Sequence, residues 1–450
     1  MRFPPGPGNS LPLLSENSPR TNDRFATPYN GAPVTTSSLV GRARRLPYGW
    51  IIVAVLCVTE TVTWGIIYYG FPVFLRPMEE ALGASRVAVT GAFSIGLGVS
   101  ALSALPVGRW LDRHGPRALM TTGSCLATVL TFAWSQVESL PALYAVWFLM
   151  GFALASTLYE PAFAVVVSWF TDRRDTALLV LTLAGGLAST IFMPIEAWLL
   201  ERLGWRPALV TLAIVLGVLT IPLHALLLRR GPADLHRDAQ GRTIAAPGVT
   251  LGEATRSPVF WVLAAAFVIS TFASVTITIH LIPFLGERGY TATVAAAAIG
   301  WIGFMQVFGR ALFVPIATRL GPLAMTAAVF TTQGLGIAQL PLVGRQIHTV
   351  VPFVAMQGTA NGMSTLVRAS TLAELFGARH YGSISGAIAL GTNSSRAIAP
   401  VAASLLWVAL GGYESLFWFF AAALVAAAGA VLVVRARTNK STSRHEESGR

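Results

Sequence analysis

The sequence predicts an all-α polytopic membrane protein, with twelve transmembrane helices arranged as two parallel six-helix repeats. Three observations lead to this prediction. Of the 450 residues, 54% are hydrophobic and 12% are charged, and a soluble protein carries roughly twice that charged fraction. Long apolar runs separated by short charged loops recur along the chain, as expected for membrane-spanning helices. The two halves also share residues at a fixed spacing, which indicates an internal repeat.

The apolar runs are long enough to cross a bilayer, which takes roughly 20 residues of helix. Polar loops set the boundaries of each run. The twelve expected helices cover residues 48–75, 87–107, 118–136, 140–168, 176–200, 207–228, 258–283, 292–316, 322–343, 348–373, 382–409 and 413–434.

One long polar segment, residues 229–257, divides the expected helices into two groups of six. We expect an N-terminal six-helix bundle at 48–228 and a C-terminal one at 258–434, joined by this segment as a cytoplasmic linker. Residues 1–47 are rich in Pro, Ser, Asn and Arg and lack the apolar core of a signal peptide. A disordered cytoplasmic tail is therefore expected there, and residues 435–450 are expected to form a second cytoplasmic tail.

The net charge of +12 could suggest nucleic-acid binding, but the position of the charge argues otherwise. If the N-terminus is cytoplasmic, most of the 32 Lys and Arg residues lie in the tails and inner loops. This is the positive-inside bias of membrane proteins. We therefore expect a multi-pass protein of the cell membrane, a bacterial inner membrane, with both termini cytoplasmic, the lipid bilayer as its surroundings and no nucleic-acid partner.

An offset of 206 residues relates the two halves. Chance matches among common residues are expected, but several in the same topological places are not. The matched pairs are Arg113 with Arg319, Gly115 with Gly321, Pro116 with Pro322, Phe170 with Phe376, Gly185 with Gly391 and Pro194 with Pro400.

A dense polar stretch, residues 108–117, separates the second and third expected helices. It resembles the signature loop of the major facilitator superfamily, with Pro116 in place of a usual basic residue. The resemblance implies the twelve-helix major facilitator fold and implies that Asp112 contacts the start of helix eleven when the inner face is closed. A simpler interpretation is that its arginines only set the topology. The residues expected to form a conformational latch are Gly108, Asp112, Arg113, Gly115 and Arg117.

Shorter stretches resemble the monocarboxylate and oxalate–formate porter group. They are Pro47-Tyr-Gly-Trp50, Tyr68-Tyr-Gly-Phe-Pro72 and the run from Trp169 to Ala177. The resemblance implies a small organic anion as substrate. Monocarboxylate porters carry an Asp-x-x-x-Arg pair on helix eight, where this chain has Gln306 and Arg310. Oxalate–formate porters place a Lys on helix eleven at the position of Gly391, and Arg396 lies about one and a half turns further on.

Ionisable residues inside membrane helices cost roughly 2.5–3.5 kcal/mol on insertion scales and are functional candidates for that reason. In this chain the acids fall in the first half and the arginines in the second. The acids are Glu60, Glu160 and Glu196, and the arginines are Arg310, Arg368 and Arg396. We expect Glu196 to lie at the membrane interface.

Arg310 is the leading candidate for substrate binding, because a guanidinium stays charged and needs an anionic partner. Arg396 is the second. Trp64, Tyr68 and Tyr69 of the first helix, Gln306 and Asn361 complete the expected site. Structural alternatives remain open. Arg310 could pair with a glutamate of the other half or reach the interface, Arg396 could pair with Glu374 or Asp112, and Arg368 is expected to pair with Glu374.

Proton coupling needs a group whose protonation changes near neutral pH, and burial can bring a carboxyl group there. Glu60 is the first candidate and Glu160 the second. His280 is the third, since imidazole titrates in this range. Each has a structural alternative. Glu60 could neutralise a cavity arginine, Glu160 could shape the helix before Pro161, and His280 could cap the end of helix seven.

Absent motifs narrow the function. The sequence has no P-loop pattern, no zinc-protease motif and no nucleophile elbow, and Cys57 and Cys125 suggest neither a disulfide nor a metal site. We expect no enzyme activity, no metal and no cofactor. The predicted function is a secondary active transporter that moves a small organic anion, a monocarboxylate, by alternating access in symport with a proton. The alternatives are proton-driven efflux of a lipophilic or cationic compound, and a transport-inactive membrane sensor.

Overall fold

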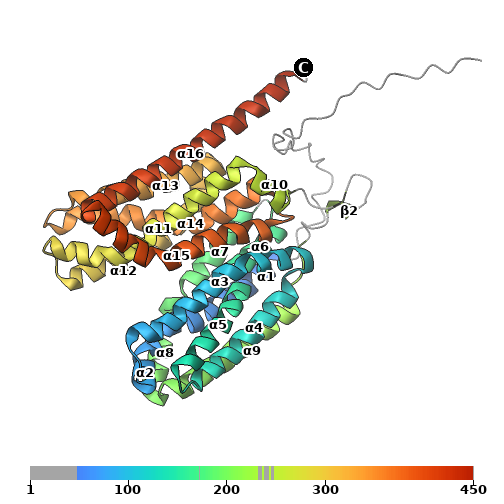
Figure 1. The fold of residues 1–450 in the computed structure, drawn as a ribbon. Helices are drawn as coiled ribbons and strands as arrows, with labels where there is room; N and C mark the ends of the chain where they lie inside the picture. The colour runs from blue at the N-terminus through green and yellow to red at the C-terminus, as the bar shows by residue number, and fades with distance from the viewer. Residues whose placement is uncertain (1–47, 172, 232–235, 238–242, 245–247, 449–450) are drawn as a thin grey trace, which may run out of the picture. The chain divides into compact units, whose positions relative to one another are not determined.

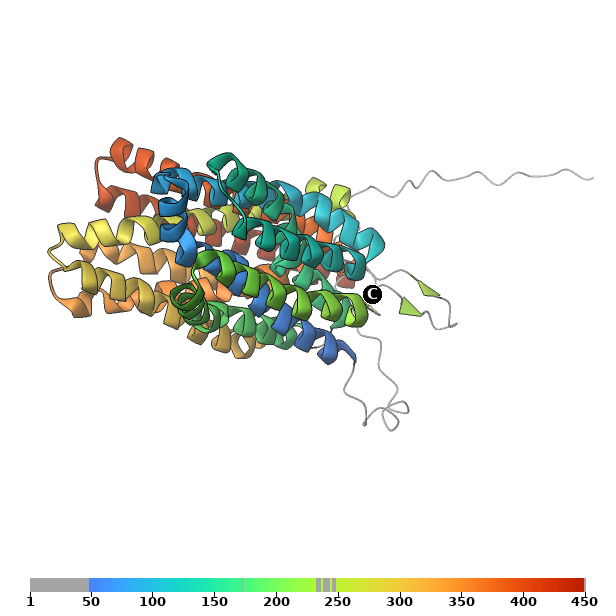
Figure 2. The same ribbon diagram turned by 90° about the horizontal axis from the view of Figure 1, so that it is seen from below.

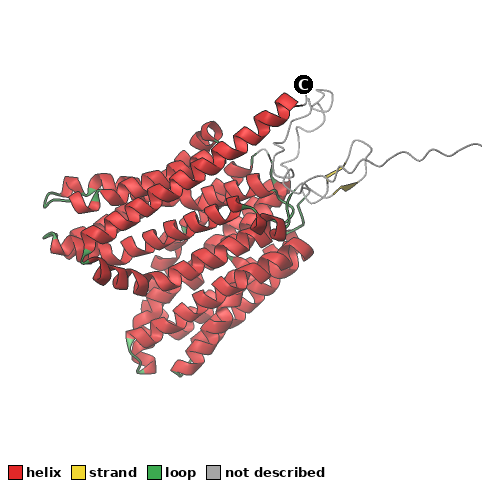
Figure 3. Cartoon of the chain, turned by 45° about the horizontal axis from the view of Figure 1, so that its top comes forward, coloured by secondary structure: helices red, strands yellow, loops and turns green. Residues whose placement is uncertain are grey.

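The computed structural model describes residues 48–171, 173–231, 236–237, 243–244 and 248–448. Nearly all of them are helical (Figure 3). The tail expected at residues 1–47 lies outside the described residues. Residues 44–433 make up one structural unit, which is described below, and residues 1–43 and 434–450 belong to a second.

The first half contains six long helical segments, coloured blue to green in Figure 1. The first is continuous but turns π-helical in its middle, and the fourth and fifth are each broken once. Their bounds are α1 Tyr48–Thr63, η3 Trp64–Tyr69 and α2 Gly70–Leu82; α3 Arg86–His114; α4 Pro116–Ser135; α5 Leu140–Thr157 and α6 Tyr159–Trp169; α7 Arg174–Gly186 and α8 Ala188–Leu203; and α9 Trp205–Leu227.

The second half contains six more, coloured yellow to red. They are α11 Pro258–Glu287, α12 Ala292–Leu320, α13 Pro322–Ala338, α14 Val351–Phe376, α15 Tyr381–Leu410 and α16 Tyr413–Ser448, with short 3₁₀ turns η5 Leu340–Leu342 and η6 Ile347–Thr349 between α13 and α14. The segment between the halves holds an antiparallel pair of short strands, β1 His236–Arg237 and β2 Thr243–Ile244, and a short helix, α10 Leu251–Arg256. Thr250 and Glu253 form a capping box that starts α10, a sequence pattern that favours helix initiation.

Within the described residues, ten of these segments are long and apolar enough to cross a membrane. The other two of the twelve, α14 and α15, carry polar side chains within their length. Gln357, Asn361 and Arg368 lie on α14, and Asn393 and Arg396 lie on α15. These side chains lower the hydropathy of helices that are otherwise as long as their neighbours.

The helix bounds reproduce the repeat. α12 begins and ends 206 residues after α3, and α13 begins 206 residues after α4. The turn between each pair is a single glycine with positive φ, 83° at Gly115 and 72° at Gly321, a region that favours glycine because it has no Cβ. The expected repeat is confirmed at the level of individual turns.

Each half has its own apolar core. In the first half Phe71, Trp134 and Trp147 pack together, with the Phe71 and Trp147 rings 4.9 Å apart. In the second half Phe284, Phe353 and Phe417 belong to the corresponding apolar core. The two clusters share no residues, so each half packs mainly on its own side chains.

The halves meet along a small set of helices. α3 packs along α15, as Figures 1 and 2 show, and α7 packs on α12 and α14. The α3–α15 contact depends on glycine, because a Cβ on Gly108 would lie 2.0 Å from the carbonyl oxygen of Gly382. We call the end of the bundle at which α3 and α14 end and α4 and α15 begin the linker end.

Candidate functional site

Four aromatic residues of the first half lie close together and form what we call the aromatic cluster: Trp64, Tyr68, Tyr69 and Tyr159. The Trp64 ring lies 4.9 Å from Tyr68, 6.3 Å from Tyr69 and 5.2 Å from Tyr159. The sequence spacing placed only Trp64 and Tyr68 on one face. The π-helical turn at η3 adds a residue to the turn and so brings Tyr69 to Trp64 as well, and such turns are frequent at functional sites.

Glu60 lies one turn before the aromatic cluster on α1 and is fully buried. Its Oε2 accepts a hydrogen bond of 3.0 Å from Trp64 Nε1. Its Oε1 has no partner among the described residues. Glu60 therefore supports the cluster through Trp64 and forms no ion pair with an arginine in the described part of the chain.

Arg310 reaches from α12 to the first half. Its Nη1 donates a 3.1 Å hydrogen bond to the carbonyl oxygen of Thr182 on α7, and a Cβ on Gly186 would lie 2.2 Å from the same nitrogen. The guanidinium lies within electrostatic range of Tyr69 and Tyr159. Among the described residues no carboxylate lies within ion-pairing distance of it, so the alternative of a salt bridge to a glutamate is not formed here.

Arg396 lies on α15 with an accessible side chain, within electrostatic range of Tyr68 and Tyr69. The structure contradicts both of its expected structural pairings. Asp112 binds the backbone at the start of α15, and Glu374 forms no ion pair with Arg396 within the described residues. Tyr69 is the residue that has both Arg310 and Arg396 in range.

Gln306 and Asn361 differ in their surroundings. Gln306 lies one turn before Arg310 on α12 and is half-buried. Asn361 is tied into a polar network inside the second half, where its Oδ1 accepts 3.0 Å hydrogen bonds from Ser274 Oγ and Gln333 Nε2. Asn361 is therefore held by its own half, and only its side-chain nitrogen is left to contact a ligand.

Glu160 joins the two halves. It forms a 2.5 Å ion pair with Arg368 of α14 and accepts a 2.8 Å hydrogen bond from Ser385 Oγ of α15. The expected pairing of Arg368 with Glu374 is wrong. The chain breaks at Leu158, between α5 and α6, because Pro161 cannot donate the hydrogen bond that would continue the helix. The break sets Glu160 at the start of α6.

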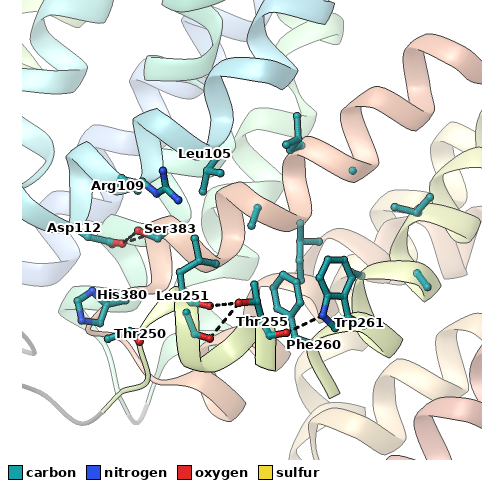
Figure 4. A pocket seen from close by; sticks show the side chains of 18 of the residues that line it. Leu105, Arg109, Asp112, Thr250, Leu251, Thr255, Phe260, Trp261, His380 and Ser383 are labelled. Atoms are coloured by element: carbon teal, nitrogen blue, oxygen red, sulfur yellow. Dashed lines mark hydrogen bonds between the residues drawn. The ribbon is translucent and has the colours of Figure 1, made fainter. Parts of the chain in front are cut away.

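Asp112 lies at the N-terminus of α15. Its Oδ1 accepts a 2.9 Å hydrogen bond from the Gly382 amide, and its Oδ2 accepts a 2.7 Å one from the Ser383 amide and another from Ser383 Oγ. Figure 4 shows the part of this contact between Asp112 and Ser383. A carboxylate at a helix N-terminus satisfies free amide groups and interacts favourably with the helix dipole.

Arg113, Gly115 and Arg117 contact the first half and the segment that follows it. α3 extends to His114, so Gly108, Asp112 and Arg113 lie on the last turns of a helix and not in the expected loop. Arg117 Nε donates to the carbonyl oxygen of Ala225 near the end of α9, and Arg230 Nη2 donates to the carbonyl oxygen of Arg113. Gly115 makes the turn into α4.

A third acid crosses between the halves and was missed in the sequence. Asp175 Oδ1 on α7 accepts a 2.6 Å hydrogen bond from Ser370 Oγ on α14. We call Asp112, Glu160 and Asp175 the carboxylate seam, since all three carry first-half acids to second-half donors near the linker end. The sequence signal for Asp175 was weak, because its serine partner lies 195 residues away.

The positions of His280 and Glu196 also differ from those expected. His280 does not end its helix, since α11 continues to Glu287 through Pro283. His280 is buried, and its ring lies 5.7 Å from that of Tyr413. Glu196 is fully buried and not interfacial, because α8 packs it against η3 and α2.

A cavity of about 910 Å³ lies beside the Asp112 contact, between α3, α10, α11 and α15 (Figure 4). Apolar side chains such as Leu105, Phe260 and Trp261 make up most of its lining, with Arg109 at its edge. Neither Arg310 nor Arg396 lines it. The cavity is therefore separate from the two candidate substrate arginines.

Comparison with known proteins agrees with this architecture. Residues 50–400 match the Major Facilitator Superfamily. The chain is 26% identical to the oxalate:formate antiporter of Oxalobacter formigenes over 70% of this chain and 76% of the antiporter. It is also 26% identical to monocarboxylate transporter 13 of Bos taurus over 73% of this chain and 76% of that protein.

Solved structures show the same fold. The Escherichia coli fucose:proton symporter FucP (N162A) superposes with a TM-score of 0.67 at 15% identity, covering 86% of this chain and 99% of the symporter. The human organic anion transporter MFSD10 (TETRAN) superposes with a TM-score of 0.64 at 14% identity, covering 85% and 99%. The protein is a multi-pass membrane transporter, not an enzyme, with twelve transmembrane helices in two repeats, and it belongs to the Major Facilitator Superfamily.

Proposed function

We propose that the protein transports a small organic anion, a monocarboxylate, by alternating access with a proton as the coupling ion. One observation carries the proposal. Arg310 of α12 and Arg396 of α15 both lie within electrostatic range of Tyr69, and neither has an acid within ion-pairing distance among the described residues. Two guanidinium groups without an acid partner favour an anionic ligand.

The nearby acids already have partners other than Arg310 and Arg396, and this supports the proposal of an anionic substrate. Glu160 is paired with Arg368, and Glu60 accepts a hydrogen bond from Trp64. The charge of Arg310 and Arg396 is therefore left for a ligand. Tyrosine hydroxyls can orient a carboxylate by donating hydrogen bonds to it. The names of two relatives, an oxalate:formate antiporter and a monocarboxylate transporter, point to the same class of substrate.

We propose that the linker end faces the cytoplasm, in a cell membrane with both termini inside. The carboxylate seam then closes the cytoplasmic side in this conformation. In alternating access the two halves rock about a central site, so the seam must open for substrate to reach the cytoplasm. Its three acids accept hydrogen bonds from donors of the second half, including the Gly382 and Ser383 amides at the start of α15. Such contacts can be broken and formed again together.

Of the three proton candidates, Glu60 remains next to the aromatic cluster. Glu160 is occupied by Arg368, and His280 packs against Tyr413 within the second half. We therefore propose Glu60 as the proton acceptor on the cluster side. Its unpartnered Oε1 leaves one oxygen available for a proton.

Proton-driven efflux of a lipophilic cation is the second candidate function, and the four aromatic rings beside Glu60 favour it. A thermal-stability screen of the purified protein separates the two. Stabilisation by formate, acetate or oxalate supports the anion proposal. Stabilisation by a lipophilic cation such as tetraphenylphosphonium, with none by the carboxylates, contradicts it. Uptake of a labelled carboxylate into proteoliposomes then distinguishes a transporter from a membrane sensor that binds without transport.

Asp112→Asn is expected to shift the conformational balance and slow turnover while changing substrate affinity little. The amide keeps one acceptor but loses the charge that interacts with the α15 N-terminus, an effect of about 0.3–2 kcal/mol. Distances between spin labels on the two halves at the linker end report the balance, and the ligand-induced thermal shift reports affinity. A large loss of affinity with an unchanged distance distribution would show that Asp112 belongs to the substrate site.

A further inference from the structure

Glu196 is a buried acid that the proposed site does not use. Its relative exposure is 0%. Neither carboxyl oxygen has a hydrogen-bond partner within the described residues. The carboxyl group instead faces the backbone of the first helix, where a Cβ on Gly70 would lie 2.7 Å from Oε1 and 3.3 Å from the carboxyl carbon.

Burial of this kind favours the neutral form of the group. A buried carboxylate has a high desolvation cost unless it is paired or hydrogen-bonded. The segments packed against α8 supply no such partner to it. The ionisable side chains that they carry are Tyr48, Cys57 and Glu60 on α1, Tyr68 and Tyr69 on η3, Arg76, Glu79 and Glu80 on α2, Arg174 and Asp175 on α7, and Arg206 and His224 on α9, and none is bonded to Glu196.

The contact depends on the π-helical turn of the first helix. The Gly70 amide donates to the carbonyl oxygen of Gly65, the five-residue step that closes a π turn. Both glycines face α8. Phe192 packs on Gly65, where a Cβ would lie 2.3 Å from its ring, and Glu196 packs on Gly70 one turn later. Two glycines five residues apart thus match two α8 side chains four residues apart.

Loss of the π turn would remove this match. A π turn holds one residue more than an α turn, so its closure would rotate the following residues by roughly 100° about the helix axis. Gly70 would then leave Glu196, and a residue with a side chain would take its place. The same rotation would move Tyr69, which lies on another face of η3 within range of Arg310 and Arg396.

We propose that Glu196 is a second proton-binding group of the transporter, which holds a proton while η3 is π-helical and exchanges it with water when the first helix changes its register. The proton would then be linked to the position of Tyr69 without contact between Glu196 and the substrate. This inference rests on the proposed transport function, but part of its test does not.

The first experiment is spectroscopic and needs no substrate. Infrared spectra of the purified full-length protein should contain the C=O stretching band of a protonated carboxylic acid, absent in Glu196→Gln and present in Glu201→Gln. Glu201 is the matched control because it is an exposed glutamate on the same helix. Glu196→Asp keeps the acid and should shift the band, which preserves the test if Glu196→Gln folds poorly.

The second experiment measures the coupling of carboxylate accumulation to a pH gradient, in proteoliposomes reconstituted with the full chain. A single coupled proton contributes a factor of about ten in accumulation for each unit of pH gradient. Glu196→Gln should therefore accumulate labelled carboxylate about tenfold less than the wild type at a one-unit gradient, with exchange at equal pH retained. Glu201→Gln should match the wild type in both assays.

Two results would overturn the proposal: an unchanged carboxylic-acid band in Glu196→Gln, or wild-type accumulation by that variant. Failure of the wild type to transport any carboxylate would refute the proposed substrate class instead. In that case the infrared experiment still decides whether Glu196 holds a proton.

Discussion

Arg310→Ala is expected to weaken carboxylate binding by about 10- to 150-fold, because it removes charge-assisted hydrogen bonds that contribute about 1.5–3 kcal/mol. Carboxylate uptake at subsaturating concentration should fall in proportion. Arg310→Lys should lie between the alanine variant and the wild type, since lysine keeps the charge but not the planar fork of donors. Binding is measured from ligand-induced thermal stabilisation, and uptake from labelled carboxylate in proteoliposomes.

A second substitution reaches the same guanidinium from the opposite helix. Gly186→Ala places a methyl group 2.2 Å from Arg310 Nη1, so it should displace the side chain and reduce uptake even though Arg310 is kept. Gly303→Ala is the matched control on α12, because no atom lies within 4 Å of its added Cβ. Wild-type carboxylate binding in both Arg310 variants would remove Arg310 from the substrate site.

The Glu160–Arg368 ion pair is expected to hold the linker end closed. Glu160→Gln leaves the Arg368 charge buried without its acid, and breaking a buried pair in this way costs about 3–5 kcal/mol. The side chains are 14% and 21% exposed, so we expect the lower part of that range. This free-energy cost arises only in the closed conformation, in which contact between the two halves buries the Arg368 charge. The closed conformation should therefore lose population to the open one.

Spin labels on the two halves would detect this change. Arg173→Cys and Arg379→Cys place labels at exposed, repeat-related positions near the linker end, in a background with Cys57 and Cys125 replaced by serine. Glu160→Gln should lengthen the distance between them. The exchanged pair Glu160→Arg with Arg368→Glu should restore part of the short distance. An unchanged distance in Glu160→Gln would show that the pair does not control closure.

The π turn at residues 64–69 and the helix break before Pro161 show the limit of prediction from sequence. The spacing of Glu60, Trp64 and Tyr68 correctly put Trp64 beside Tyr68 but could not show that Tyr69 joins them, because nothing in residues 64–69 distinguishes a π turn from an α turn. Glu160 before Pro161 indicated a distorted helix, and the chain does break at Leu158. Local sequence predicted the distortion, but the partner of Glu160 lies 208 residues away.

Several pairings were therefore wrong or missing. Arg368 was expected to bind Glu374 six residues on, and it binds Glu160 of the other half. Glu196 was expected at the interface because it lies near a helix end, but two glycines of the first helix allow α8 to bury it. Asp175 went unnoticed because a serine partner leaves no charge pattern to recognise.

The sequence by itself determined the twelve helices, the repeat and the family, because a membrane helix must satisfy its own backbone hydrogen bonds and so depends on local apolar length. Only the tertiary structure decided which charges are paired, which are free and which acid is buried alone. These outcomes depend on how separate helices dock, and docking is decided by side-chain shapes and glycine contacts between residues that lie far apart along the chain.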